Sequence, residues 1–177
     1  IAALNALSAI LFERGDYDIQ AADTFDEIEP TDYGKVTAVG ALVPIIKKLI
    51  ASDSDFSILE LDPKTLKERE KKYFEPADRA DTAVPYSDLL VITGVTILND
   101  TLPGLLEMAK PGAEIAVTGP TAGMIPDVLF DMGVNIAGGI LVTDADGLLD
   151  IIAEGGSGYH FFGKYAERTV IKKNKTH

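Results

Sequence analysis

Short apolar runs alternate with amphipathic stretches along the chain from residue 35 onward. Most of the apolar runs are bounded by Gly, Pro or Asp, a pattern typical of buried strands. The stretches between them place apolar residues three and four positions apart, which predicts helices. We expect strands at 35–40, 56–61, 88–94, 113–119, 135–143 and 168–173, and helices at 41–52, 102–110, 126–132 and 146–154.

Strands that alternate with helices indicate βαβ units and therefore a parallel sheet. The strands are apolar along almost their whole length, so both faces of the sheet should be covered. With right-handed crossovers, the pattern predicts an α/β fold with a doubly wound, mostly parallel sheet, which is a Rossmann-like three-layer sandwich. The last strand is expected at an edge. Residues 65–74, TLKEREKKYF, break the rhythm, and their dense charge predicts an exposed helix.

The first part of the chain follows a different pattern. Its apolar residues have helical spacing up to Gly15, and residues 16–34 are rich in Asp and predict a linker. A helix this apolar must pack on something, so we expect the chain to be part of a longer protein. The predicted division is a remnant helix of an N-terminal domain plus a linker at 1–34, and a Rossmann-like domain at 35–177.

Composition and charge narrow the possible partners. The formal net charge of −12 argues against a nucleic-acid partner, because phosphate contacts need clustered Lys and Arg. The chain has no Cys, which excludes disulfides and thiolate metal sites. No apolar run approaches the roughly 20 residues of a membrane span, and no secretion signal is visible. We therefore expect a cytoplasmic protein with no membrane partner.

Several catalytic motifs are missing from the sequence. The first turn has a single glycine, Gly40, where a dinucleotide site would have G-x-G-x-x-G, and there is no P-loop. The two histidines are His160, which lies between aromatic residues and is expected to be packed, and His177 at the last position. Ser87 and Ser157 have no base nearby in the sequence, and G-x-S-x-G is absent, so serine hydrolysis is not expected.

The carboxyl ends of the strands are the expected binding surface. Ligands of open α/β sheets bind there, at the point where the strand order reverses. Glu60 ends the second strand, where a carboxylate can accept hydrogen bonds from ribose hydroxyls; the alternative is that it caps a turn or faces solvent. Thr93, Thr118 and Thr143 are equally spaced and each ends a strand, which predicts that they lie at one height. Gly138-Gly139 predicts a bulge or a close backbone contact.

Other polar residues at these strand ends leave two interpretations open. Asn99, Asp100 and Thr101 are all good N-caps, so they either cap the following helix or include one residue that faces a ligand. Thr121 either starts a turn or helps to hold an anion with the N–H groups that follow it.

Once the strands are placed, the ordered series of their ends resembles one family. Val91–Gly94, Asn99–Pro103 and Val117–Pro120, together with Leu59–Pro63 and Ala2–Ala6, are similar to the putative heavy-metal chelation family. The resemblance implies an atypical Rossmann-like domain, an enolase-N-terminal-like domain ahead of it, and a pocket between the two. Carried over, it implies that this pocket is lined or shaped by Asn5, Gly40, Glu60, Thr93, Asn99, Gly119 and Pro120.

Three functions remain open from the sequence. The first is binding of a small molecule or a metal complex at the carboxyl edge; the second is an adenosyl- or nucleotide-dependent, transferase-type enzyme; the third is an assembly domain without a ligand. The cofactor is unknown, with a divalent metal or a metal complex as the open options, and we expect a homo-oligomer. The candidate ligand-binding residues are Asn5, Gly40, Ala41, Glu60, Asp62, Thr93, Gly94, Asn99, Thr101, Gly119, Pro120 and Thr121.

Overall fold

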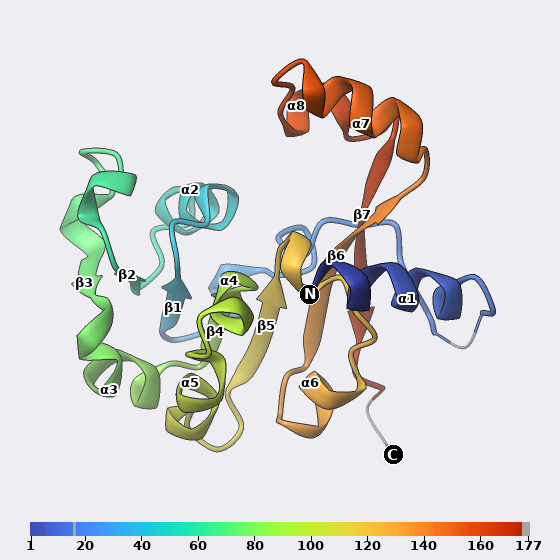
Figure 1. Ribbon diagram of the computed structural model, residues 1–177. Helices are drawn as coiled ribbons and strands as arrows, with labels where there is room; N and C mark the ends of the chain where they lie inside the picture. Colours follow the sequence, from blue (N-terminus) through green and yellow to red (C-terminus); the bar gives the residue numbers. More distant parts are fainter. Residues whose placement is uncertain (16, 175–177) are drawn as a thin grey trace.

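A computed structural model describes residues 1–15 and 17–174 and contains a seven-stranded sheet (Figure 1). The strand order is β3-β2-β1-β4-β5-β6-β7, and the first six strands run parallel to their neighbours. β7 pairs antiparallel with β6 at the edge, as predicted. The strands are β1 Val36–Val39, β2 Phe56–Glu60, β3 Phe74–Pro76, β4 Leu89–Thr93, β5 Glu114–Thr118, β6 Ile136–Val142 and β7 Ala166–Lys172.

Helices cover both faces, so the predicted doubly wound, mostly parallel three-layer fold is confirmed. Figure 1 also shows α7 and α8 at the far end of the β6–β7 ribbon, set off from the rest of the molecule. The helices are α1 Ala2–Phe12, α2 Val43–Ala51, α3 Ala80–Ala83, α4 Val95–Leu98, α5 Leu102–Met108, α6 Asp127–Asp131, α7 Ala145–Ala153 and α8 Gly158–Phe161.

Two hydrophobic cores hold these layers together, one on each face of the sheet. Alternate strand residues point to opposite faces, so Val39 packs toward α3, α5 and α6, whereas its neighbour Ala38 packs toward α2. On the α2 face, Ile45 and Leu49 are fully buried against the strands. Each such side chain stabilises the fold by about 1.5–3 kcal/mol. The helices α2 and α5 cover opposite faces of the sheet, which leaves a crevice between them where β1 and β4 end.

The segment 17–34 differs from the predicted linker, because it pairs with the edge of the sheet at Gln20 and packs on the α2 face from Ala22 to Tyr33. Ile28 is 1% exposed and Thr24 is 3% exposed, and Gln20 pairs with Val170 on the outer side of β7. Gly138 makes room for this segment, since a Cβ there would lie 1.8 Å from Thr24 Oγ1. The close backbone contact predicted at Gly138-Gly139 is therefore present. The sequence pattern missed the packing because Asp-rich composition hid the few buried positions.

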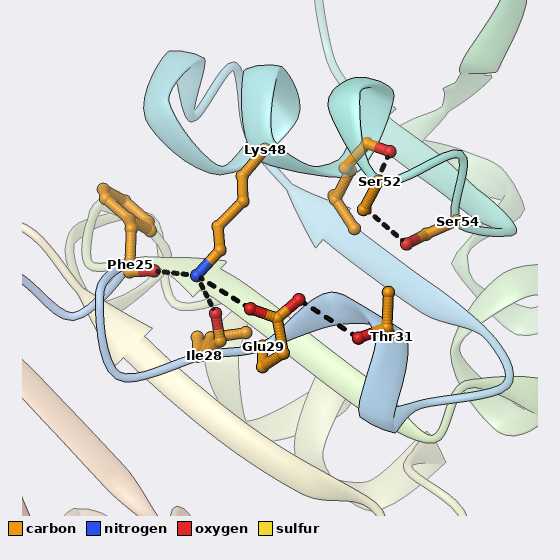
Figure 2. Close-up of polar contacts among 8 residues, drawn as sticks. Phe25, Ile28, Glu29, Thr31, Lys48, Ser52 and Ser54 are labelled. Atoms are coloured by element: carbon orange, nitrogen blue, oxygen red, sulfur yellow. Dashed lines mark hydrogen bonds and ion pairs between the residues drawn. The ribbon is translucent and has the colours of Figure 1, made fainter.

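Lys48 of α2 fastens the same segment from the helix side. Figure 2 shows its ammonium group donating hydrogen bonds to the carbonyl oxygens of Phe25 and Ile28. Glu29 Oε2 lies 3.8 Å from the same nitrogen. These contacts satisfy backbone carbonyls that have no strand partner, and they fix the position of the segment over α2.

The charged stretch at 65–74 is not the exposed helix that the sequence predicts. It contains a short 3-10 helix, Lys71–Tyr73, and then enters β3, which the pattern missed. Glu70 is 1% exposed and its carboxylate accepts a hydrogen bond from Lys67 N at 2.9 Å, closing a turn. The ring of Tyr73 stacks on the ring of Phe56, with 4.0 Å between the two ring centres. Tertiary contacts with β2 therefore override the local helical preference.

Two further predictions need correction. Thr93 and Thr118 are paired in register, but Thr118 pairs with Gly138, so Thr143 lies farther out along the ribbon and not at the same height. His160 is exposed and not packed between aromatic rings, and its Nδ1 accepts a hydrogen bond from Ser157 N at 3.0 Å in a capping box. The other histidine, His177, lies outside the described residues.

Within residues 1–15 and 17–174, no helix is both long enough and apolar enough to cross a membrane.

Candidate functional site

The strand order reverses between β1 and β4, and a pocket of about 270 Å³ lies at their carboxyl ends. We call it the switch pocket. It combines a largely apolar wall with a few polar side chains, which is typical of small-molecule sites. It is lined by Val39, Gly40, Ala41, Leu59, Glu60, Leu61, Ala77, Thr93, Val95, Thr96, Asn99, Thr101 and Leu105.

Glu60 is the acidic side chain of this pocket and ends β2. Its Oε1 accepts hydrogen bonds from Leu61 N at 2.7 Å and from Asp62 N at 3.3 Å. These bonds hold the carboxylate in place. Among the described residues, Oε2 has no hydrogen-bond partner, so a ligand hydroxyl or N–H group could donate to it. Glu60 therefore caps a turn through Oε1, as one of the two interpretations predicts, and its Oε2 remains available to accept a hydrogen bond from a ligand.

Asn99 and Thr101 form the opposite polar side of the pocket, ahead of α5. Asn99 Oδ1 accepts hydrogen bonds from Thr101 Oγ1 at 2.7 Å and from Thr101 N at 3.3 Å. Neither side chain caps α5 itself. Because the carbonyl oxygen of Asn99 is occupied, its amide NH₂ group remains as the donor that a ligand could use.

Gly40 shapes the floor of the pocket. Its φ of +96° is one that L side chains rarely adopt, and a Cβ there would lie 2.8 Å from Thr93 Cγ2. Glycine therefore lets the end of β1 lie directly beside Thr93 of β4. Thr93 Oγ1 also accepts a long hydrogen bond from Val95 N at 3.4 Å, which leaves its hydroxyl hydrogen free to face a ligand.

The structure brings half of the predicted site residues together. Gly40, Ala41, Glu60, Thr93, Asn99 and Thr101 line the switch pocket. The others lie outside it. Asp62 caps a 3-10 turn by accepting from Lys64 N. Gly119, Pro120 and Thr121 form the turn after β5, and Gly94, at the start of α4, lies beside that turn. The sequence analysis missed the apolar lining Leu61, Ala77, Val95 and Leu105; Ala77 follows β3, which the pattern did not predict.

Asn5 reaches this edge from α1 but belongs to a different cleft. Its Nδ2 donates a hydrogen bond to Pro120 O at 2.8 Å, and its buried Oδ1 has no partner among the described residues. The cleft, of about 500 Å³, lies between α1, the β6–β7 ribbon and α7 and is mostly apolar. Thr121 Oγ1, beside Gly94, is likewise buried without a partner in the described part of the chain. These two oxygens therefore lie at and beside the turn after β5, and not in the switch pocket.

Two displaced pKa values occur at the other edge of the sheet. Burial, and then a hydrogen bond with Glu114, raise the pKa of Tyr33 to about 12. The hydrogen bonds from Lys110 and from the backbone N–H of Lys35 lower the pKa of Asp88. Both residues lie near the amino ends of β1, β4 and β5, so these displaced values reflect structural ion pairing and burial away from the pocket.

The donor set of the switch pocket does not fit a bare heavy-metal ion. It offers one carboxylate, Glu60, with neutral hydroxyl and amide groups, whereas soft metals prefer sulfur and imidazole ligands. In the described part of the chain, no three His, Cys, Asp or Glu side chains are grouped so that they could hold a metal.

Comparisons with known proteins agree with this architecture. An uncharacterized protein of Methanocaldococcus jannaschii is 27% identical over 172 residues, which is 96% of this chain and 64% of that protein. A protein of unknown function from Pyrococcus horikoshii has a TM-score of 0.80 at 22% identity, covering 97% of this chain and 66% of the other. Another from Desulfitobacterium hafniense has a TM-score of 0.66 at 26% identity, with coverage of 91% and 60%.

The chain thus spans about two thirds of the length of these relatives. Both solved relatives are described as members of the DUF364 family. The model of that family, described as putative heavy-metal chelation, matches residues 23–171. The match begins inside the segment that packs on the α2 face and extends from before β1 into β7, so the chain belongs to the putative heavy-metal chelation family.

Proposed function

We propose that the protein binds a small organic molecule, including one that itself carries a metal ion, in the switch pocket. The observation that supports this most is the free Oε2 of Glu60, whose carboxylate is held through Oε1 by two backbone N–H groups at the rim of an apolar pocket. A charge-assisted hydrogen bond to such an oxygen contributes about 1.5–3 kcal/mol. A ligand that brings its own chelating groups would supply the metal donors that the pocket lacks.

A second candidate is an adenosyl or nucleotide ligand, as a transferase-type enzyme would use. The position of Glu60 at the end of β2 favours it, because a carboxylate there can accept hydrogen bonds from the hydroxyls of a ribose. The apolar side chains of Leu61 and Val95 offer surfaces for a flat base. The single glycine of the first turn weighs against the usual dinucleotide mode.

A binding screen with a matched pair of variants tests both candidates. Adenosine, S-adenosylmethionine, and divalent metals with and without organic chelators are titrated calorimetrically. Glu60→Gln keeps an oxygen for the two backbone donors and replaces the free oxygen with NH₂, whereas Asp62→Asn changes the neighbouring exposed carboxylate.

We expect Glu60→Gln to lower the affinity for a ligand about tenfold or more, and Asp62→Asn to change this affinity less than about twofold. Binding of adenosyl compounds would favour the second candidate; binding of chelator complexes alone would favour the first. A ligand held equally by wild type and Glu60→Gln would contradict the assignment of the site. If no ligand of any class bound, the assembly role would be favoured instead.

A further inference from the structure

A second cavity, of about 370 Å³, lies on the α2 side of the β1 end, over β5 and β6. It adjoins the switch pocket, with which it shares Ala41. Its polar lining comes from four separate parts of the chain: Asp23 and Thr24, the backbone at the start of α2, Thr118 of β5, and Arg168 of β7. We call it the α2 cavity.

Arg168 enters the α2 cavity in a fixed orientation. Its guanidinium lies over the ring of Phe162, 3.8 Å from the ring centre, and its Nε is 3.1 Å from Asp23 Oδ2. Asp23 Oδ1 accepts a hydrogen bond from Phe25 N at 3.1 Å, so the protein already engages both oxygens of this carboxylate. The ion pair uses the Nε side of the guanidinium and leaves its two terminal amino groups as donors.

Thr24 supplies a buried donor without an acceptor. The side chain is 3% exposed, and its Oγ1 accepts a hydrogen bond from Thr118 Oγ1 at 2.9 Å. Its own hydroxyl hydrogen has no acceptor among the described residues. A buried donor left unsatisfied is destabilising, so this hydroxyl calls for an acceptor that the described residues do not supply.

The start of α2 adds one backbone donor at the same place, Val43 N–H, because Leu42 N donates to Gly40 O at 2.8 Å and Pro44 has no N–H. This nine-residue helix begins at Val43, and Leu42 provides no side-chain cap. The first N–H groups of a helix have no acceptor within it, and the helix start carries a partial positive charge. Donors therefore line the α2 cavity from three directions, and the carboxylate of Asp23 is neutralised by its pairing with Arg168.

We propose that the α2 cavity binds a phosphate group. Phosphate presents several acceptor oxygens at tetrahedral angles, so one group can meet Arg168, the Thr24 hydroxyl and the Val43 N–H group together. The phosphate is either free or part of an ester; since the two cavities adjoin at Ala41, an ester could extend into the switch pocket.

Calorimetric titration with inorganic phosphate at constant ionic strength tests this proposal. Arg168→Gln removes the guanidinium, and Lys172→Gln is its matched control, because Lys172 lies on the same strand and also pairs with an acidic residue of the packed segment, Glu27. We expect saturable binding to the wild type, a loss of about tenfold or more in Arg168→Gln, and a change below about twofold in Lys172→Gln.

Thr24→Val provides a test without a change of charge. It removes the hydroxyl at nearly constant side-chain volume and should lower the affinity for phosphate several-fold. Circular dichroism checks that the variant folds. Methyl phosphate in place of phosphate separates the two sources: tighter binding of methyl phosphate indicates an ester.

Three results would overturn the proposal: no phosphate binding to the wild type, full binding in Arg168→Gln, or equal losses in Arg168→Gln and Lys172→Gln. The phosphate titration with Arg168→Gln and the ligand screen with Glu60→Gln probe the two cavities separately, so failure of this proposal is distinguishable from failure of the switch-pocket assignment.

Discussion

Replacing Gly138 with alanine tests whether the segment 17–34 is an integral part of the domain. The new Cβ would lie 1.8 Å from Thr24 Oγ1 and 2.7 Å from Thr118 Oγ1, distances that require the segment to move away from β6. Overpacking of a well-packed site costs about 1–3 kcal/mol. We expect Gly138→Ala to destabilise the protein by this amount, with a Tm lower by roughly 2–4 °C per kcal/mol.

Gly104→Ala is the matched control. Gly104 lies inside α5, where nothing stands within 4 Å of an added Cβ, so alanine should stabilise the helix by about 0.5–1 kcal/mol. Urea unfolding of both variants measures the two free energies. A double variant with Thr24→Ala should recover part of the loss through a coupling of about 1 kcal/mol. If Gly138→Ala were as stable as the wild type, the segment would not pack as described.

Three further changes probe the ion pairs and the surface. The hydrogen bond from Lys110 lowers the pKa of Asp88, so the ionised carboxylate stabilises the protein above the ordinary carboxyl pKa. This stabilisation is lost as the pH falls through the lowered pKa. Asp88→Asn should therefore flatten the acid side of a stability–pH curve measured by urea unfolding. The pKa of Tyr33 is raised to about 12 by burial and Glu114, so wild-type stability should fall between pH about 10 and 12, and Tyr33→Phe should remove that fall in the same assay. Leu7 is 62% exposed on the apolar helix α1, and we predict that the protein is a homo-oligomer. Leu7→Glu should raise the dissociation constant of this oligomer about tenfold or more, as measured by sedimentation.

The periodic parts of the fold were predictable from sequence, whereas the irregular parts were not. Runs such as Leu89–Ile92 are apolar throughout, and that feature alone indicates a strand buried on both faces. β3 was missed because Phe74–Pro76 is short and follows a charged stretch with strong helical preference. The packing of Thr24 was missed because a single small polar residue carries no periodic signal.

The same distinction applies to the candidate sites. Glu60, Thr93 and Asn99 could be found because polar residues at strand ends must meet at one edge of a parallel sheet. Leu61 and Ala77 could not, because their place in the lining depends on how the crossover after β2 returns to the sheet. Arg168 lies on an antiparallel strand far along the chain, so only the register of β6 with β7 brings it to this edge.

Chemical-shift mapping by NMR shows directly whether a ligand binds in the switch pocket, since it locates the ligand without relying on a variant. With a ligand identified by the binding screen, we predict the largest amide shifts at Gly40, Leu61, Thr93, Val95 and Asn99, at the carboxyl ends of β1, β2 and β4. Shifts centred instead on Tyr33 and Asp88 at the opposite edge, or on α7 and α8, would contradict the account.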